Sequence, residues 1–243
     1  MPRHTAIQYA ILSAGEGSRL QQEGIGVPKP LVKINGVPMI ERLVNIFLEN
    51  NASSISVVIN DLYKDVEIHL KEMAKKSDIP IQVITKTTPS SLHTFYELMP
   101  YFTAEKICVT TVDTMFKPEE FAKFVRFFAE MPEEFSGLLA VTSYVDDEKP
   151  LYVQTDDQGK IIGFYDQPAK NCKYVSGGIY GFTQKVLAPL QKARTTEMKR
   201  MRNFQRMLLE EGLLLKAYPF SKIIDVDHVQ DITKAERLIK NNE

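Results

Sequence analysis

The chain has 243 residues, 44% of them hydrophobic and 25% charged, and its 30 basic and 31 acidic residues leave a formal net charge of −1. A chain of this length can bury a substantial core and form one large α/β domain. The balanced charge provides no global basic field, so we expect no nucleic acid partner.

The first nine residues are polar, and no long apolar segment follows them. This pattern argues against a signal peptide or a membrane span, so we expect a cytoplasmic protein with no membrane partner. Cys108 and Cys172 are the only cysteines. Two cysteines so far apart indicate neither a disulfide framework nor a zinc site, and Cys108, in an apolar run, is expected to be a packed thiol.

The first predicted strand ends at Ser13 and runs into a loop that contains Gly15 and Gly17. Glycines lack Cβ and tolerate positive φ, so backbone N–H groups there can approach an anion closely. Arg19 and Lys29, the latter between two prolines, supply the positive charge that a polyphosphate needs. The stretch therefore predicts a phosphate-binding loop.

The spacing of this loop differs from two common phosphate-binding motifs. A Walker loop requires a lysine directly after its last glycine, and a dinucleotide-binding fingerprint requires a third glycine where this chain has Leu20. An ordinary strand-loop-helix turn with incidental basic residues remains the alternative.

Strands and helices alternate as far as about residue 130. The predicted elements are a short strand at 32–36 that ends in a turn, a helix at 38–50, a strand at 54–60, a helix at 62–76, a strand at 81–85, a helix at 92–98 with Ser90 or Ser91 as its N-cap, a strand at 106–112 and a helix that begins at Pro118. This alternation predicts right-handed βαβ crossovers and a mainly parallel sheet.

The rhythm changes after Gly137. We expect strands at 138–145, 151–155, 161–165 and 174–182, helices at 185–190 and 197–211, a strand at 214–218, and a segment at 223–227 that leads into a helix at 230–240. The basic cluster between Lys192 and Arg206 is interpreted as a solvated helix face, with a substrate lid or a subunit contact as the alternative. No repeat or linker is visible, which favours a single domain over residues 1–243.

Three carboxylates follow apolar runs: Asp113, Asp225 and Asp227. In open α/β sheets ligands bind beyond the carboxyl ends of the strands. Carboxylates that converge on phosphates suggest Mg²⁺, although capping a turn or helix is the alternative for each. For Asp231, which precedes the last predicted helix, capping is the expected role.

The segments Leu12-Ser13-Ala14-Gly15-Glu16-Gly17-Ser18-Arg19 and Pro28-Lys29-Pro30-Leu31 together resemble the signature of the nucleotidylyltransferases that make nucleoside-diphosphate sugars. The resemblance implies a Rossmann-like α/β fold whose mixed, mainly parallel sheet carries helices on both faces. It also implies a nucleotide-binding half at about 1–135 and a sugar-phosphate-binding half at about 136–243. The implied nucleotide-binding residues are Leu12, Ala14, Gly15, Gly17, Ser18, Arg19 and Ser91, and the implied catalytic residues are Arg19, Lys29 and Asp113.

The same resemblance extends to the metal site. Val112-Asp113 occupies the place of the family's first metal-binding aspartate, and the stretch from Ile224 to Asp231 is similar to the family's C-terminal metal-binding segment. By register Asp225 matches the second ligand of Mg²⁺, and Asp227 is the alternative. His228 is expected to lie near the site or on the surface and is given no catalytic role.

The implied sugar-phosphate site is Asp166, Gln167, Ser176 and Gly178. The segment from Gly163 to Pro168 looks like the family's Glu-Lys-Pro segment, but Gln167 replaces the lysine and so removes a charge. Lys170 or Lys173 could take its place. The glycines around Gly178 fit a strand that a sugar must approach closely, with a plain edge strand as the alternative.

The sequence does not predict which nucleotide base is bound. The family commonly has Gly-Leu where this chain has Ser91-Leu92, and a serine there can hydrogen-bond a base but narrows the pocket. His93, on the same turn, is expected to be packed or capping.

The resemblance implies Mg²⁺-dependent nucleotidyl transfer from a nucleoside triphosphate to a sugar 1-phosphate. Two alternatives are a cytidylyltransferase for phosphocholine or another non-sugar phosphate, and a catalytically silent regulatory protein that binds nucleotide or sugar phosphate. A homo-oligomer is expected by analogy with relatives.

Overall fold

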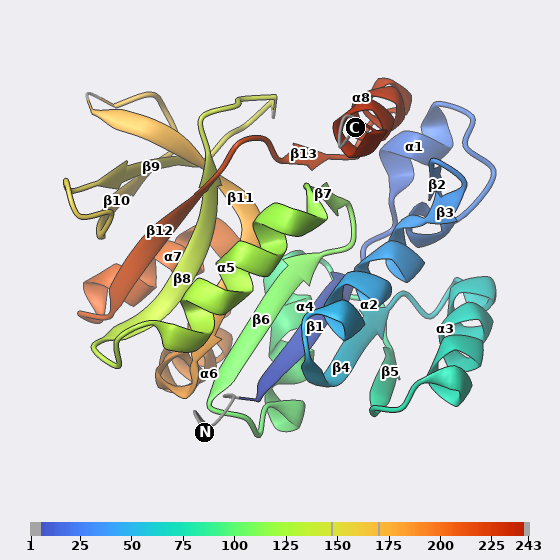
Figure 1. Ribbon diagram of the computed structural model, residues 1–243, viewed down its shortest axis with the longest axis horizontal. Coiled ribbons are helices and arrows are strands. Elements are labelled where there is room, and N and C mark those ends of the chain that lie inside the picture. Colours follow the sequence, from blue (N-terminus) through green and yellow to red (C-terminus); the bar gives the residue numbers. More distant parts are fainter. Residues whose placement is uncertain (1–5, 147, 170, 241–243) are drawn as a thin grey trace.

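The computed structural model describes residues 6–146, 148–169 and 171–240, and its centre is a nine-stranded sheet (Figure 1). Seven strands follow one path in the order β10-β9-β11-β6-β1-β4-β5, while β8 pairs with β11 and β12 pairs with β8. Their bounds are β1 Ile7–Ser13, β4 Ala52–Ile59, β5 Ile81–Thr85, β6 Lys106–Thr111, β8 Phe135–Thr142, β9 Tyr152–Thr155, β10 Ile161–Tyr165, β11 Cys172–Thr183 and β12 Leu214–Phe220.

The N-terminal part of the sheet is parallel, as the sequence predicts. β1 pairs in parallel with both β4 and β6, and β4 pairs in parallel with β5. All seven residues of β1 are buried, because this central strand has helices over both of its faces. Ser13 lies opposite Ile59, so the connections that follow β1 and β4 emerge side by side.

The C-terminal part makes the sheet mixed. β11 is antiparallel to β6, β8 and β9, and β12 runs parallel to β8. β11 is the strand that joins the two parts, since its second half pairs with β6 and its first half with β9. Residues on both sides of about residue 135 therefore contribute to one continuous sheet.

Helices cover both faces of the sheet (Figure 1). One face carries α2 Met39–Glu49, α3 Lys64–Lys76 and α5 Pro118–Glu130, and the other carries α4 Ser91–Leu98, α6 Leu187–Thr195 and α7 Met201–Glu210. The sequence places Phe121, Phe124 and Phe128 on one face of α5, and all three are fully buried. The predicted fold class is confirmed.

A third, smaller core lies beyond the carboxyl end of the parallel strands. It joins α1 Ser18–Gln22, the hairpin β2 Lys33–Ile34 and β3 Val37–Pro38, and α8 Val229–Lys240 through buried side chains such as Leu20, Ile34 and Leu238. The short strands β7 Thr114–Met115 and β13 Ile224–Asp225 pair beneath it. In Figure 1, α8 consequently lies beside α1 although they are at opposite ends of the chain.

Some predicted boundaries are wrong. The helix expected at 185–190 continues to Thr195, whereas the short strand and turn expected at 32–36 are present as β2 and the turn between β2 and β3. The helix expected from Glu197 begins at Met201, because Glu197 adopts a positive φ of 55° and residues before Met201 form a loop. The carbonyl groups of Met198 and Lys199 in this loop accept hydrogen bonds from Tyr96 and Ser90, contacts that local periodicity does not reveal.

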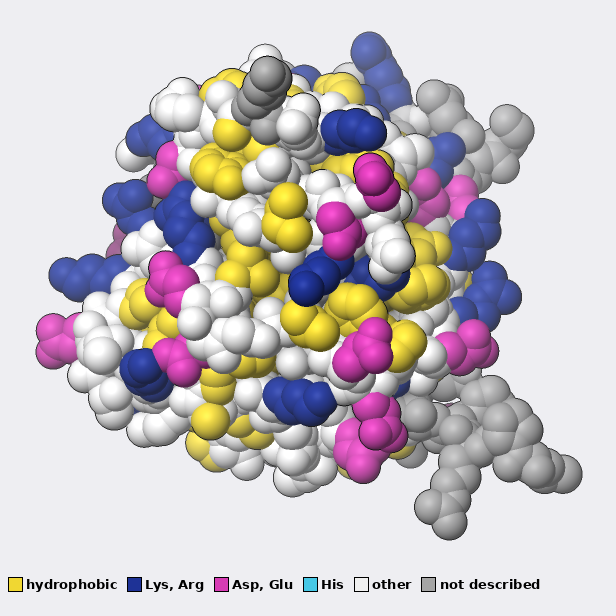
Figure 2. Space-filling model, turned by 90° about the vertical axis from the view of Figure 1, so that its left-hand side faces the viewer, with side chains coloured by type: hydrophobic (Ala, Val, Ile, Leu, Met, Phe, Trp, Pro, Cys, Tyr) yellow, Lys and Arg dark blue, Asp and Glu magenta, His cyan; other side chains and the backbone are white. Residues whose placement is uncertain are grey.

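Acidic and basic side chains are interspersed on the face shown in Figure 2. This face belongs to the C-terminal part of the sheet, and hydrophobic side chains separate its charges. Within the described ranges no helix is both long and apolar enough to cross a bilayer. Cys108 is fully buried, and burial raises the pKa of its thiol, so it packs as predicted.

Candidate active site

The glycine loop leaves β1 at Ser13 and lies at the carboxyl edge of the parallel strands. Gly17 has a φ of +64°, and a Cβ built there would lie 2.7 Å from the Cβ of Lys29. A glycine is therefore required at position 17 for two reasons: the backbone there is left-handed, and Lys29 approaches too closely for a side chain to fit. In the described chain the amides of Gly15 and Gly17 donate no hydrogen bond to protein, which leaves both available to an anion.

Lys29 reaches from the Pro-Lys-Pro segment into a pair of carboxylates. Its Nζ lies 2.5 Å from Asp113 Oδ2 and 2.7 Å from Asp227 Oδ1. Burial lowers the pKa of Lys29, but the two carboxylates raise it by more, so it stays charged with a pKa above its ordinary value. The side chain of Lys29 is only 13% exposed, so water screens this ion pair little.

A short antiparallel ladder brings the three aspartates together. Asp225 of β13 lies opposite Thr114 of β7, and the backbone N–H of Val226 donates to the carbonyl of Asp113 at 3.0 Å. Asp113 lies 112 positions before Asp225 and 114 positions before Asp227, yet this ladder sets the three around one point. The predicted convergence of the carboxylates is therefore a consequence of β7 and β13 pairing.

Asp113 and Asp225 have opposite electrostatic environments. Burial raises the pKa of Asp113, but Lys29 lowers it by more, so that its pKa lies below the usual range. Burial, and to a lesser extent the charge of Asp113, raises the pKa of Asp225 to about 8. The residue nevertheless lines a surface pocket. Asp225 Oδ1 accepts a hydrogen bond from the neutral Thr114 Oγ1 at 3.1 Å.

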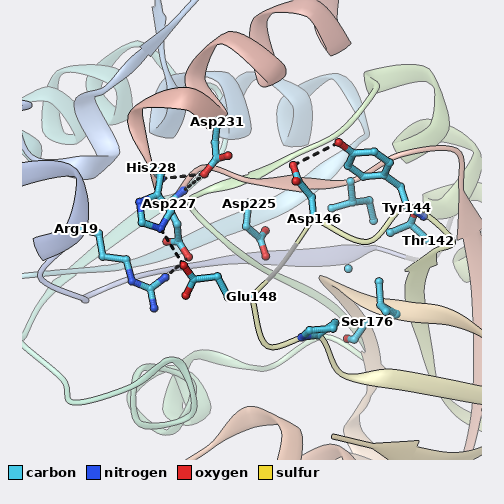
Figure 3. A pocket seen from close by; sticks show the side chains of 14 residues that line it. Arg19, Thr142, Tyr144, Asp146, Glu148, Ser176, Asp225, Asp227, His228 and Asp231 are labelled. Carbon is cyan, nitrogen blue, oxygen red and sulfur yellow. Dashed lines mark hydrogen bonds and ion pairs between the residues drawn. The ribbon is translucent and has the colours of Figure 1, made fainter. Parts of the chain in front are cut away.

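Asp227 holds a second cation besides Lys29. Arg19 Nη1 lies 2.8 Å from Asp227 Oδ2. The pocket drawn in Figure 3 is lined by these residues. Arg19, Asp227 and His228 lie on one side of it and Ser176 on the other, with Asp225 between them. Asp227 is thus part of an ion-pair network, whereas Asp225 is not paired with a lysine or arginine among the described residues.

His228 and Asp231 lie just beyond these aspartates. Asp231 Oδ2 accepts hydrogen bonds from the backbone N–H groups of Asp227 and His228, so the capping prediction is confirmed. It caps from the first turn of α8. His228 Nδ1 pairs with Glu23 Oε1 at 2.5 Å, which ties α8 to the end of α1.

The predicted nucleotide-binding residues line one cleft of about 500 Å³, a volume within the range of small-molecule sites. Its lining includes Leu12, Ala14, Gly15, Gly17, Ser18, Arg19, Lys29, Ser91, Asp113 and Asp227. The structure therefore brings together all six predicted positions of the first motif, the lysine, two of the aspartates and the serine at the base-recognition position.

A second hollow of about 270 Å³ adjoins this cleft. Ser91 and Thr111 line both, while Ser176, Gly178 and Asp225 line the second. Gly178 has a φ of +73°, and a Cβ there would lie 2.9 Å from Thr114 Oγ1. A glycine is required at this position by its backbone conformation and by the packing against Thr114.

Asp166 and Gln167 lie in a neighbouring hollow. Asp166 is bound by Arg202 Nη1 at 2.6 Å and by Arg206 Nη2 at 2.8 Å, both from α7. Gln167 lines the same hollow, together with Arg200 and Arg202.

The free basic groups of the second hollow are Lys199 and Arg200, from the loop before α7. In the ranges that the structure describes, neither side chain forms an ion pair or hydrogen bond, whereas Arg202 is held by Asp166 and by the carbonyl of Lys149.

The two lysines that could take the place of Gln167 are Lys170 and Lys173. Lys173 lines a different hollow, on β9 and β12. Lys170 lies outside the described residues. Sequence reasoning missed Lys199 and Arg200 as site residues, and its one signal was the basic cluster that contains them.

Ser90 is the N-cap of α4, one of the two residues predicted for this role. Its Oγ accepts from the backbone N–H of His93 at 3.4 Å and also hydrogen-bonds His93 Nδ1 at 2.8 Å. His93 packs edge-on against Tyr96, so it is packed and capping as expected.

The donor set around Asp113 and Asp225 fits Mg²⁺. Among the described residues, no three His, Cys, Asp or Glu side chains form a ready-made metal cluster. Mg²⁺, however, is commonly held by one or two carboxylates together with phosphate oxygens and water. Asp225 repels Asp113 and forms no ion pair with a lysine or arginine among the described residues, so a divalent cation there would relieve this repulsion.

The chain belongs to the nucleotidyl transferase family, whose model matches residues 9–242. It is 22% identical over 252 residues to the bifunctional protein GlmU of Thermodesulfovibrio yellowstonii, covering 97% of this chain and 52% of that protein. The chain spans about half the length of the curated relatives that it matches along most of its own length.

Two solved structures share the fold. The inositol-1-phosphate CTP transferase from T. maritima superposes with a TM-score of 0.77 at 18% identity, covering 98% of both chains. A nucleoside-diphosphate-sugar pyrophosphorylase from Vibrio cholerae superposes with a TM-score of 0.69 at 18% identity, covering 95% of this chain and 100% of that one. The family resemblance that the sequence motifs carry is confirmed.

Proposed function

We propose that this protein transfers a nucleotidyl group from a nucleoside triphosphate to a sugar 1-phosphate, in a reaction that requires Mg²⁺. The observation that carries the proposal is the position of Lys29, with its ammonium group between Asp113 and Asp227 and its stem against Gly17. Lys29 thereby joins the phosphate loop to the carboxylates, at the point where a bound triphosphate and an incoming phosphate would meet.

In this reaction an oxygen of the acceptor phosphate forms a bond to the α-phosphorus, the bond between that phosphorus and the bridging oxygen breaks, and pyrophosphate leaves with the electron pair. A phosphate monoester is already anionic near neutral pH, so no general base is needed. Catalysis then consists of positioning and of stabilising negative charge.

The chain offers a group for each of these tasks. The Gly15 and Gly17 amides and Arg19 would hold the β- and γ-phosphates, which become pyrophosphate. Lys29 would leave its carboxylate partners in part to neutralise the α-phosphate and the attacking oxygen. Asp227, which contacts both cations, would orient them in the free protein.

We assign Asp113 and Asp225 to the Mg²⁺ ion. When bound, the ion would neutralise charge on the α-phosphate. We favour Asp225 over Asp227 as the second ligand because Asp227 is paired with Lys29 and Arg19, whereas the partner of Asp225 among the described residues is the Thr114 hydroxyl.

We place the acceptor in the hollow lined by Ser176, Gly178 and Asp225. Gln167 carries no charge, and Lys199 and Arg200 line this hollow without an ion-pair partner among the described residues. We infer that one or both of them contact the acceptor phosphate.

Cytidylyl transfer to a non-sugar phosphate is the second candidate. The uncharged Gln167 and the Ser91 side chain, which narrows the base pocket, favour it. The silent regulatory alternative is less favoured, since a protein that only binds nucleotide has no use for three converging carboxylates.

Pyrophosphate release tests these proposals together. Purified protein with Mg²⁺ is screened with ATP, GTP, CTP, UTP and dTTP against a panel of sugar 1-phosphates, inositol 1-phosphate and phosphocholine. Release that requires one nucleotide, one acceptor and Mg²⁺ supports the reaction and names its substrates. Release with none of the pairs, from folded protein that binds nucleotide, would favour the regulatory alternative.

A further inference from the structure

The loop that holds Gly15 and Gly17 is attached to the neighbouring connection, which follows β4. β1 and β4 are adjacent and parallel, with Ser13 opposite Ile59, so residues 14–17 and 60–63 leave the sheet next to each other. The second connection is a turn closed by a hydrogen bond from the N–H of Tyr63 to the carbonyl of Asn60 at 3.3 Å. This turn places two polar side chains beside the loop.

Both side chains bind carbonyl groups of the loop. Asn60 Nδ2 donates to the carbonyl of Ala14 at 3.2 Å, and the hydroxyl of Tyr63 donates to the carbonyl of Glu16 at 2.7 Å. Asn60 is 1% exposed, and its Oδ1 accepts from the N–H of Leu62 and the hydroxyl of Thr87, so its orientation is fixed. Tyr63 also accepts a hydrogen bond from Gln21 of α1.

These two contacts determine which way the loop amides point. A peptide unit is planar and trans, so the carbonyl of one residue and the N–H of the next point in opposite directions. With the carbonyl of Ala14 turned to Asn60, the N–H of Gly15 points away from it. With the carbonyl of Glu16 turned to Tyr63, the same holds for Gly17. In the described chain neither of these amides donates a hydrogen bond to protein.

We propose that Asn60 and Tyr63 are positioning residues, which fix alternate carbonyls of the glycine loop so that the Gly15 and Gly17 amides face a bound triphosphate. This inference rests on the proposed function, because it assigns the anion to that site. Neither residue touches the reacting atoms. They hold the loop in its binding conformation before the nucleotide arrives. Without these contacts, the glycines would let the loop interconvert among several conformations.

Tyr63→Phe is the direct test, since it removes the hydroxyl and keeps the half-buried ring that packs against the core. We expect the KM for the nucleoside triphosphate to rise about tenfold, the effect of one or two lost hydrogen bonds. The kcat and the KM for the acceptor should change little, because the loop contacts only the phosphates of the donor.

Tyr9→Phe is the matched control. The Tyr9 hydroxyl also donates to a backbone carbonyl, that of Asn50 at 2.9 Å, but Tyr9 is a buried core residue near the start of β1, away from the glycine loop. This variant should lose thermal stability and keep the wild-type KM for the nucleotide. An equal rise in KM in both variants would show that Tyr63 acts only through general stability and would overturn the proposal.

Two readouts that need no turnover separate this inference from the proposed function. Backbone amide relaxation should show greater mobility of Gly15 and Gly17 in Tyr63→Phe than in the wild type or Tyr9→Phe. Calorimetry with inorganic tripolyphosphate should show about tenfold weaker binding. A loop of unchanged mobility and unchanged affinity overturns the positioning role. Weaker tripolyphosphate binding in a protein that releases no pyrophosphate upholds that role and contradicts the proposed reaction.

Discussion

The two sides of the cleft are built in different ways. On the donor side, the glycine loop, Lys29 and Asp113 follow parallel strands or lie close to them in sequence, and the fold brings their ends to one edge. On the acceptor side, Ser176 and Gly178 come from an antiparallel strand, and the unpaired cations come from the loop before α7. A short motif can describe the first arrangement, whereas the second depends on tertiary contacts.

The charges on the two sides differ as well. Lys29 and Arg19 are already paired with carboxylates, so a nucleotide must exchange places with Asp113 or Asp227. Lys199 and Arg200 have no such partner in the described chain. In the proposed reaction, the donor side would therefore be organised before substrate binds, and the cations of the acceptor side would gain their anion partner from the substrate.

Removing the donor-side lysine should have the largest effect. Lys29→Ala should lower kcat by roughly a hundredfold to a thousandfold, the scale seen when one charge-stabilising group is lost from an active site. Circular dichroism should show the fold intact. The control is Lys33→Ala, which removes an exposed lysine four positions further along the chain. Turnover that stays at the wild-type level in Lys29→Ala would remove this residue from the mechanism.

The two candidate metal ligands can be separated by the Mg²⁺ requirement. Asp225→Asn should raise the Mg²⁺ concentration that gives half-maximal rate by about tenfold or more, since a carboxylate ligand is lost. Asp227→Asn should leave that concentration near the wild-type value, because its partners are Lys29 and Arg19. The measurement is a Mg²⁺ titration of the initial rate. The reverse pattern would make Asp227 the ligand.

Arg200→Ala and Arg202→Ala test the acceptor side. Loss of Arg200, which is unpaired, should raise the KM for the acceptor by roughly tenfold, as for one charge-assisted hydrogen bond. The KM for the nucleotide should not change. Arg202 is held by Asp166, so its loss should have a smaller effect on the acceptor. An unchanged KM for the acceptor in Arg200→Ala would leave Lys199 as the contact, and an unchanged KM in the double variant Lys199→Ala/Arg200→Ala would place the acceptor phosphate elsewhere.

The smallest change concerns stability: Gly178→Ala should lower the free energy of unfolding. The positive φ and the contact with Thr114 should cost about 1–2 kcal/mol, measurable by denaturant titration. Gly159→Ala is a control that also has a positive φ, but its Cβ would have only an ordinary contact at 3.7 Å. A smaller loss of stability at Gly178 than at Gly159 would contradict the role of the Thr114 contact.

The sequence predicts the donor side well because its information is local. A buried strand, two glycines and a lysine between prolines define a phosphate loop, and βαβ alternation sets the direction of the neighbouring strands. Even here, the contacts of Asn60 and Tyr63 with the loop could not be predicted, because they link residues 46 and 47 positions apart.

The acceptor side was less predictable for a physical reason. The break before Met201 arises from hydrogen bonds of the loop to Ser90 and Tyr96, residues about a hundred positions away. Helical periodicity is a local pattern and does not reveal contacts with distant residues, so the helix was predicted to begin too early. The roles of Lys199 and Arg200 follow from that break, and the sequence could indicate only that a basic cluster was present.

Phosphorus NMR of the reaction, with the nucleotide and acceptor found by the screen, tests the assignment most directly. With Mg²⁺ present, wild-type protein should form pyrophosphate and a nucleoside-diphosphate product at equal rates, and Lys29→Ala should form neither at a comparable rate. Release of inorganic phosphate, or an unchanged spectrum from folded wild-type protein with nucleotide bound, would contradict nucleotidyl transfer at this site.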